Sequence, residues 1–233
     1  MKLPSYQDAV FVLDPAAGLT DGNLWRDSAP HGIDITPNAN FAAPNYGLGI
    51  GPSGASYIEF GGGGVLQSGS LPLRFYDYAP PGPCTWAFVV RHMTPTPNAN
   101  IFDCRPAAGN RGLRLAEFTT SQCDMQWWDA GGVQRLVRDP VGLPANQGRT
   151  VVRIFSADTD LSVGYVWRDR TQYAPITVFG GTRAYDTAQT PWIGSTRGLA
   201  QFWTGWLYFL GLWGRVWADS ESDAFTRFWQ DRT

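Results

Sequence analysis

The stretch "FWTGWLYFLGLWGRVW", residues 202–217, is the densest apolar run in the chain and holds four of its 11 tryptophans. A membrane span needs about 20 apolar residues, whereas this run is shorter and contains Arg215 and three glycines. An exposed aromatic platform would alternate with polar residues, so that one face of the strand stays in water. Here both alternating sets are apolar. One set is Phe202, Trp206, Tyr208, Leu210 and Leu212, and the other is Trp203, Leu207, Phe209 and Trp213. This pattern predicts a strand buried on both faces, central in a sheet.

The composition of the whole chain favours an all-β protein. Gly (27), Pro (17) and aromatic residues (14%) are abundant, and short strands joined by glycine and proline turns give that mixture. A chain of 233 residues can bury one sizeable core. No linker or shift in composition divides it, so we expect a single domain over residues 1–233.

The remaining segments support the same class. Apolar or alternating runs bounded by turn residues predict strands at 9–14, 56–60, 85–92, 100–105, 112–119, 149–156 and 161–168, and a hairpin within 124–138. The tail, 218–233, predicts a helix. Ser220 and Asp223 match a helix-start signal, and Phe225, Phe228 and Trp229 fall on one helical face. The predicted fold is an antiparallel two-sheet β-sandwich (jelly roll) with a short C-terminal helix.

The order of these segments resembles the laminin-G-like members of the concanavalin A-like lectin/glucanase superfamily. The segments are "LWRDSAPHGIDIT", "SYIEFGG", "CTWAFVVRH", "RTVVRIFSADTDLSVGYVW", "PWIGS" and the aromatic run followed by "ADSESDAF". Phe202-x-x-Gly205, Trp213, Trp217 and the Ser220 helix start match the closing signature of those domains. The resemblance covers residues 9–230 and implies a jelly roll. Because its positions are core and turn positions, it implies fold more than function.

Charge and cysteine usage limit the partners and the compartment. The formal net charge of -2 predicts no attraction to nucleic acid or to an anionic membrane. The first 14 residues contain no apolar signal-peptide core. The cysteines Cys84, Cys104 and Cys123 are odd in number and lack CxxC spacing, so we expect thiols made in a reducing cytosol.

The sequence predicts no catalytic site. The glucanases of the superfamily carry a catalytic E-x-D-x-x-E strand, and nothing like it occurs here. Glu59 and Glu117 stand alone in their strands, and Asp158 and Asp160 fall in a tight turn, where Asp is a turn former. Retaining glycoside hydrolysis needs two carboxyls about 5 Å apart. We therefore expect a protein that is not an enzyme.

No cofactor is predicted, and calcium binding is left open. Many domains of the superfamily bind calcium through Asp and Asn oxygens of loops, but no ligand spacing fixes such a site here. Turn and cap roles are commoner for aspartates of this kind. The loop carboxylates that could contribute are Asp21, Asp27, Asp103, Asp124 and Asp129.

Two aromatic groups are candidates for binding a glycan or a protein partner. Trp127 and Trp128 are adjacent in a strand and must point to opposite faces, so one can enter the core while the other faces outward beside Asp129, unless further structure covers it. Tyr185 and Trp192 form a second pair in a loop. Sugars are held by stacked aromatic rings and by hydrogen bonds from Asp, Asn or Arg. The alternative is that these rings pack against neighbouring strands or another subunit.

Three hypotheses for function follow. The first is a non-catalytic structural or interaction protein on the surface of a bacteriophage virion (decoration, fibre or tail), made in the host cytoplasm, repeated or oligomeric, with virion proteins as partners and with glycan adhesion as an added role. The second is a stand-alone carbohydrate-binding, lectin-like protein. The third is a polysaccharide hydrolase or lyase, which the missing carboxylate pair disfavours. We take the first as the working hypothesis.

Overall fold

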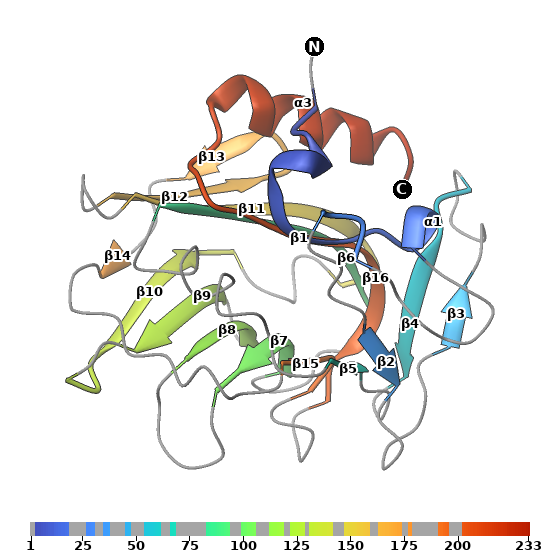
Figure 1. The fold of residues 1–233 in the computed structure, drawn as a ribbon, viewed down its shortest axis with the longest axis horizontal. Helices are drawn as coiled ribbons and strands as arrows, with labels where there is room; N and C mark the ends of the chain where they lie inside the picture. The colour runs from blue at the N-terminus through green and yellow to red at the C-terminus, as the bar shows by residue number, and fades with distance from the viewer. Residues whose placement is uncertain are drawn as a thin grey trace.

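The computed structural model describes residues 3–18, 27–30, 35–37, 45–47, 54–61, 66–68, 83–93, 99–105, 112–118, 122–128, 131–141, 147–158, 163–173, 177–178, 191–195 and 202–233. Within these ranges the chain forms two antiparallel sheets and a C-terminal helix (Figure 1). No described helix has the length and hydropathy needed to cross a membrane.

Eight strands form the first sheet, sheet A, in the order β13-β12-β11-β6-β16-β4-β3, with β1 also paired to β16. Their bounds are β1 Ala9–Leu13, β3 Asn45–Gly47, β4 Tyr57–Gly61, β6 Cys84–His92, β11 Thr150–Asp158, β12 Val163–Arg168, β13 Thr171–Tyr173 and β16 Thr204–Trp213.

The second sheet, sheet B, also has eight strands, in the order β14-β10-β9-β8-β7-β15-β5-β2. Their bounds are β2 Ile35–Pro37, β5 Leu66–Ser68, β7 Ala99–Cys104, β8 Leu113–Phe118, β9 Gln122–Trp128, β10 Gln134–Asp139, β14 Thr177–Val178 and β15 Trp192–Ile193. The helices are η1 Tyr6–Asp8, α1 Pro15–Gly18 and α3 Asp219–Gln230.

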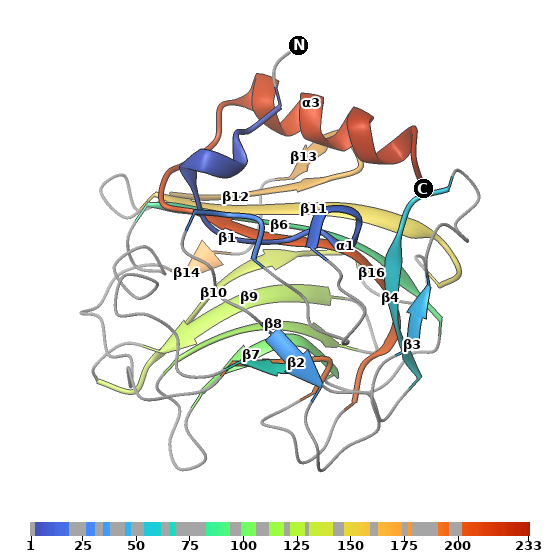
Figure 2. The same cartoon turned by 45° about the vertical axis from the view of Figure 1, so that its right-hand side comes forward.

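Three layers are stacked: α3, then sheet A, then sheet B (Figure 2). Apolar side chains from both sheets form the inter-sheet core, with Trp86, Phe88 and Phe155 from sheet A packed in the same cluster as Leu115 and Met125 from sheet B. A second apolar cluster lies on the opposite face of sheet A, where Phe225 and Trp229 of α3 pack. Sheet A is therefore covered on both faces. The predicted two-sheet sandwich with a C-terminal helix is confirmed.

The aromatic run forms β16, the central strand of sheet A. β6 pairs along one edge of β16, while β4 pairs with the first half of the other edge and β1 with the second half. Leu207 and Leu212 face the inter-sheet core, and Trp213 faces the cluster under α3. The predicted strand buried on both faces is confirmed, with narrower bounds than 202–217.

A bulge in β16 at Tyr208 changes which side chains face which layer. The register with β6 shifts between Leu207 and Phe209, and an extra residue of this kind reverses the alternation beyond it. Tyr208 and Phe209 consequently both face the outer cluster, whereas Leu210 faces the inter-sheet core. The two alternating sets expected from the sequence are therefore mixed beyond Leu207.

Close packing explains the glycine of the Phe202-x-x-Gly205 motif. A Cβ at Gly205 would lie 2.5 Å from the carbonyl oxygen of Arg91 and 2.7 Å from the ring of Trp203. No side chain fits there without displacing β6 or the indole.

A charged group also lies between the sheets. Asp139 of β10 accepts hydrogen bonds of 2.9 Å from Arg153 of β11 and from Arg168 of β12. Asp139 and Arg153 are both fully buried. Nη1 of Arg153 lies 3.2 Å from Nε2 of His92, and because arginine only donates, Nε2 is the acceptor of this contact. A buried charge requires a partner. Here the carboxylate comes from sheet B and its arginine partners from sheet A, so the contacts join the two sheets.

The start of α3 differs from the prediction. The N-cap is Ala218, two residues before the expected Ser220, and the backbone N–H of Ala218 donates to the carboxylate of Glu221 at 2.9 Å. Glu221 also pairs with Arg215 at 2.6 Å. The acidic residue that caps the helix is therefore Glu221 rather than Asp223. The predicted apolar face is correct, since Phe225 and Trp229 are buried and Phe228 packs against the same cluster.

The expectation that the three cysteines form no disulfide agrees with the structure, and the reducing cytosol remains a prediction. Cys84, Cys104 and Cys123 are buried thiols, and none of them forms a disulfide. Each lies in the inter-sheet core, where a small apolar side chain is well accommodated.

Candidate functional site

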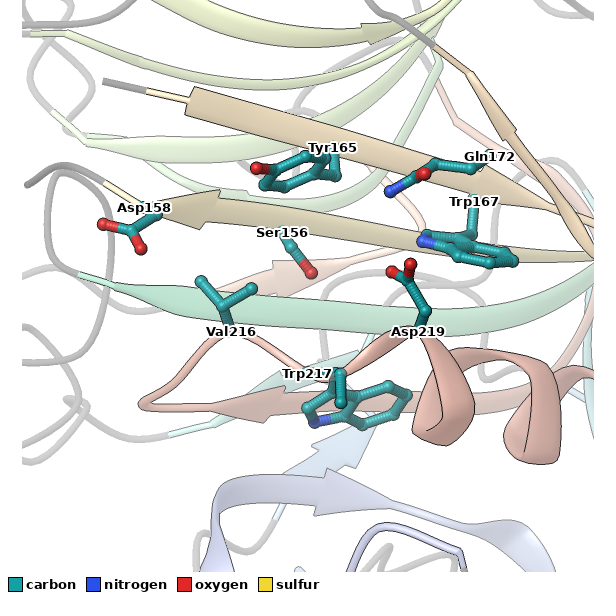
Figure 3. A pocket seen from close by; sticks show the side chains of 9 residues that line it. Ser156, Asp158, Tyr165, Trp167, Gln172, Val216, Trp217 and Asp219 are labelled. Carbon is teal, nitrogen blue, oxygen red and sulfur yellow. The ribbon is translucent and has the colours of Figure 1, made fainter. Parts of the chain in front are cut away.

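A pocket of about 340 Å³ opens on the outer face of sheet A, beside the start of α3. Its lining comes from two parts of the chain that are far apart in sequence. Strands β11, β12 and β13 supply Ser156, Asp158, Tyr165, Trp167 and Gln172, and the segment entering α3 supplies Val216, Trp217, Ala218 and Asp219 (Figure 3). This volume is at the lower end of the range for small-molecule sites, about 300–1,000 Å³.

Strand alternation places two aromatic rings on the same side of the pocket. Val166 is buried in the inter-sheet core, so its neighbours Tyr165 and Trp167 point to the outer face of sheet A. Both rings are half-buried. Residues two apart on a strand are separated by about 7 Å. Tyr165 and Trp167 thus present two ring surfaces along β12.

A third aromatic ring, the indole of Trp217, belongs to the pocket wall but packs in the core. Trp217 is 4% exposed and packs edge-on against Trp213, with ring centroids 4.5 Å apart. Its backbone N–H donates to Oγ1 of Thr85 at 3.1 Å. These contacts hold the segment that precedes α3 against β6 on the outer face of sheet A.

Ser156 contributes a hydroxyl whose orientation follows from its neighbours. Oγ1 of Thr85 donates to the carbonyl oxygen of Arg215 at 2.8 Å and lies 2.9 Å from Oγ of Ser156. Because a hydroxyl has one hydrogen, and that of Thr85 is used, Ser156 must be the donor in their contact. The lone pairs of Ser156 Oγ are left to accept a hydrogen bond at the pocket.

Two carboxylates and one amide complete the polar groups of the pocket. Asp158 is the last residue of β11, and Asp219 is the exposed first residue of α3. Gln172 of β13 lies opposite Trp167 of β12 in the strand register. Asp158 and Asp219 lie at opposite ends of the pocket, with Ser156 and Val216 between them (Figure 3). The sequence does not indicate that these two carboxylates line one pocket, because Asp158 falls in a predicted turn and Asp219 is distant from it in sequence.

The predicted tryptophan pair lies elsewhere, on sheet B. Trp127 is 1% exposed and belongs to the inter-sheet core, whereas Trp128 points to the outer face of sheet B. The alternation was predicted correctly, but Trp128 does not present an open ring, since it is only 6% exposed. The guanidinium groups of Arg105 and Arg114 lie 5.3 and 5.5 Å from its centroid. Further structure covers Trp128, which was the alternative left open by the sequence.

Ion pairs surround Trp128 on the outer face of sheet B. Arg105 donates to both carboxylate oxygens of Asp103, at 2.8 and 2.5 Å. Arg138 donates to both oxygens of Asp124, at 2.8 and 2.7 Å, and these bonds raise the pKa of the Arg138 guanidinium. The arginines are thus engaged by carboxylates, which holds them in place over the sheet.

Trp192 lies on the same outer face as Trp128. Ile193 is in the inter-sheet core, so Trp192 of β15 points the other way, and its backbone pairs with Asp103 of β7. Trp192 is half-buried. Asp129 and Tyr185, the other two candidates, lie outside the described residues. The sheet therefore brings Trp128 and Trp192 to one face, while Trp127 is a core residue.

Trp206 of β16 is another half-buried indole on the outer face of sheet A, but it is not among the residues that line this pocket. Tyr57 of β4 stacks on it at 4.3 Å, and the guanidinium of Arg91 in β6 lies 4.9 Å from its centroid. Trp206 is therefore flanked from both neighbouring strands. It offers a matched control for Trp167, as the same residue type with similar burial on the same face.

The aspartates considered for calcium have other contacts where the structure describes them. Asp27 accepts from the backbone N–H groups of Val12 and Ala29, at 2.7 and 2.8 Å, as a turn former does. Asp103 and Asp124 lie in strands rather than loops and pair with arginines, which corrects their assignment. Asp21 and Asp129 lie outside the described ranges. Among the described residues, no three His, Cys, Asp or Glu side chains are grouped as metal ligands would be.

Comparison with known proteins finds similarity in structure alone. No protein-family model and no curated protein matches the chain. The fold is similar to the botulinum neurotoxin serotype D binding domain, with a TM-score of 0.70 at 7% identity. It is also similar to the binding domain of botulinum neurotoxin DC in complex with rat synaptotagmin II (TM-score 0.70, 10% identity) and in complex with SialylT (TM-score 0.68, 10% identity).

These likenesses cover 96% of this chain but 52% of each of those three chains. The chain thus spans about half the length of the binding domains that it resembles. Identities this low establish a shared β-rich sandwich fold and leave the ligand undetermined. The relation to the concanavalin A-like, laminin-G-like superfamily stays a prediction.

Proposed function

We propose that this protein is a non-catalytic β-sandwich that binds carbohydrate in the pocket between β12 and the start of α3. The observation that carries the proposal is the pair of outward rings, Tyr165 and Trp167, on one strand of a lined pocket. Aromatic rings stack on the apolar faces of sugars, while nearby polar groups bond to hydroxyls.

The polar groups of the pocket suit hydroxyl ligands. Asp158 and Asp219 accept hydrogen bonds, Gln172 both donates and accepts, and Ser156 has lone pairs directed away from Thr85. The similar toxin domains are binding domains, one of them in complex with SialylT. This supports a binding role as an analogy of fold, with the site argued from the residues of this chain.

Two carboxylates in one pocket also raise the hydrolase hypothesis again. A retaining glycosidase holds its two carboxyls about 5 Å apart, facing each other across the scissile bond. Asp158 and Asp219 instead stand at the two ends of the pocket (Figure 3). This arrangement disfavours the retaining mechanism, and the binding experiment includes a product analysis that tests for cleavage by any mechanism.

The test is a glycan array followed by isothermal titration with the best oligosaccharide. Trp167→Ala should weaken binding about five-fold or more, since stacking on an aromatic ring contributes about 1–3 kcal/mol. Trp206→Ala, the matched control, should leave the affinity unchanged. An equal loss in both variants, or unchanged affinity in Trp167→Ala, would place the sugar elsewhere. Release of shorter oligosaccharides that stops in Asp158→Asn would favour the hydrolase.

The setting of a bacteriophage virion, with virion proteins as partners, remains our proposal from the sequence. Trp128 offers a partner little surface, because Arg105 and Arg114 cover it, so Trp192 is the described candidate that bears on assembly. Light scattering tests the idea. We expect an oligomer that Trp192→Ala weakens, because stable contacts bury about 1,200–2,000 Å² and depend on central aromatic residues. A strict monomer that binds a glycan would favour the stand-alone lectin.

A further inference from the structure

We infer that the preferred ligand of the pocket is a cationic saccharide, namely an amino sugar whose amine is free and protonated. This inference rests on the proposed function and specifies the charge of its ligand. Its basis is the sign of the groups that line the pocket. Asp158 and Asp219 are the ionisable carboxyl side chains among the nine lining residues, and none of the nine is a cation.

Arginines close to the pocket in sequence are already paired with other carboxylates. Arg168 binds Asp139 at 2.9 Å, Arg170 binds Asp223 at 3.2 Å, and Arg215 binds Glu221 at 2.6 Å.

Asp219 is the carboxylate on which the inference chiefly depends. It is exposed at the first position of α3, and no ion pair to it occurs among the described residues. Figure 3 shows its carboxylate directed toward the indole of Trp167 and the amide of Gln172. A cation seated against Trp167 would therefore meet a carboxylate at the edge of the same ring.

The aromatic rings act in the same direction as the carboxylates. The face of an indole or phenol ring carries negative potential and attracts a cation positioned over it. An ammonium on a sugar stacked along Tyr165 and Trp167 would gain both interactions. An acidic sugar would meet the like charge of Asp219, while the nearby guanidinium groups in the described part of the chain are held by Asp139, Asp223 and Glu221.

The experiment compares three tetrasaccharides that differ in charge: glucosamine, N-acetylglucosamine and galacturonic acid tetramers, titrated at pH 6 and low salt. Asp is ionised at this pH. We expect the glucosamine tetramer to bind about five-fold more tightly than the neutral one, as for unit charges about 4 Å apart in water. The uronate should bind more weakly by a similar factor. Raising the salt to 1 M should remove most of this difference.

Variants then assign the preference to the pocket. Asp219→Asn should lower the affinity for the glucosamine tetramer about five-fold more than the affinity for the neutral tetramer, because only the first loses a charge partner. Asp231→Asn is the matched control, because it removes the same charge from an exposed position at the other end of α3, and it should have no effect.

The outcomes separate the two proposals. Sugar binding that depends on Trp167 but is indifferent to charge, or favours the uronate, overturns the inference and leaves the proposed function intact. A preference for glucosamine that survives in Asp219→Asn and Asp158→Asn also overturns it. If no saccharide binds, on the array or among the tetramers, both proposals fail.

Discussion

The outer faces of the two sheets both carry tryptophan, yet they use it differently. On sheet A, Trp213 and Trp217 are buried under α3 with Phe225, while Trp167 remains half-buried at a pocket. On sheet B, Trp128 is enclosed by Arg105 and Arg114, and the carboxylates of Asp103 and Asp124 are bound by arginines. The first face is closed by apolar packing with an opening at its edge. The second is closed by ion pairs.

The difference shows that neither residue type nor position in a strand identifies a binding surface. Trp128 and Trp167 both point away from the inter-sheet core, but Trp128 is 6% exposed whereas Trp167 is half-buried and lines a pocket. An arginine that stacks on an indole makes a cation–π interaction with the ring and covers the face that a ligand would need. The candidate site is therefore found where α3 begins and leaves Tyr165 and Trp167 uncovered, rather than where tryptophans are densest.

The largest effect should come from the apolar packing of sheet A. Trp213→Ala removes a fully buried ring that packs against Phe209 and Trp217 and donates from Nε1 to the carbonyl of Ser5 at 3.1 Å. We expect a loss of about 3–5 kcal/mol in the free energy of unfolding, measured by urea denaturation. Trp206→Ala, on the same strand but half-buried, should cost about half as much. Equal losses would mean that the cover by α3 contributes little.

The ion pairs of sheet B should contribute less per residue. Asp124→Asn keeps the volume but weakens the bonds from Arg138 and Gln126 to a fully buried carboxylate. We expect a loss of about 2 kcal/mol, as for hydrogen bonds to a charged group. The control is Asp223→Asn, whose partners Arg170 and Arg227 are exposed, and it should cost under about 1 kcal/mol. A neutral Asp124→Asn would show that the outer face of sheet B is not held by charge.

Substituting the two outward tryptophans tests the comparison directly. Trp128→Ala should destabilise the fold by about 2–3 kcal/mol, because the indole is buried, and leave saccharide affinity unchanged. Trp167→Ala should cost about 1 kcal/mol of stability and most of the binding. Thermal denaturation and titration on the same samples give both quantities. The reverse pattern would move the site to sheet B, where the sequence alone placed it.

The smallest effect concerns the N-terminal segment, which lies beside the cluster of sheet A. Tyr6 donates to Asp14 at 2.9 Å and lies 6.0 Å from the ring of Phe209. Burial, and then the charge of Asp14, raises the pKa of the Tyr6 phenol. Tyr6→Phe should cost about 1 kcal/mol at pH 7.

The pH dependence of that cost follows from the raised pKa. An unfolded tyrosine ionises above about pH 10, whereas folded Tyr6 stays protonated, so the stabilisation is complete below pH 10 and declines above it. Relative to Tyr6→Phe, the wild type should therefore lose about 1.4 kcal/mol of unfolding free energy from pH 7 to pH 11, so that the variant becomes the slightly more stable protein at pH 11. A difference that is the same at both pH values would contradict the assignment.

The sequence by itself determined the class of the fold and most of its strands. Apolar runs on both alternating sets, such as residues 85–92 and 202–217, can only be satisfied between two layers. The helical spacing of Phe225, Phe228 and Trp229 predicts the apolar face of the C-terminal helix, which is one of these layers. These patterns are local, so they can be predicted from a single chain.

Tertiary structure decided the direction of individual side chains and the place of the site. The bulge at Tyr208 reverses the alternation of β16, and no residue type in the run signals it. Whether the ring of Trp128 is exposed depends on Arg105, which directly follows β7, and on Arg114 of β8. The pocket joins β11, β12 and β13 to the start of α3. Contacts between distant segments arise from how the layers pack, and local pattern carries no information on them.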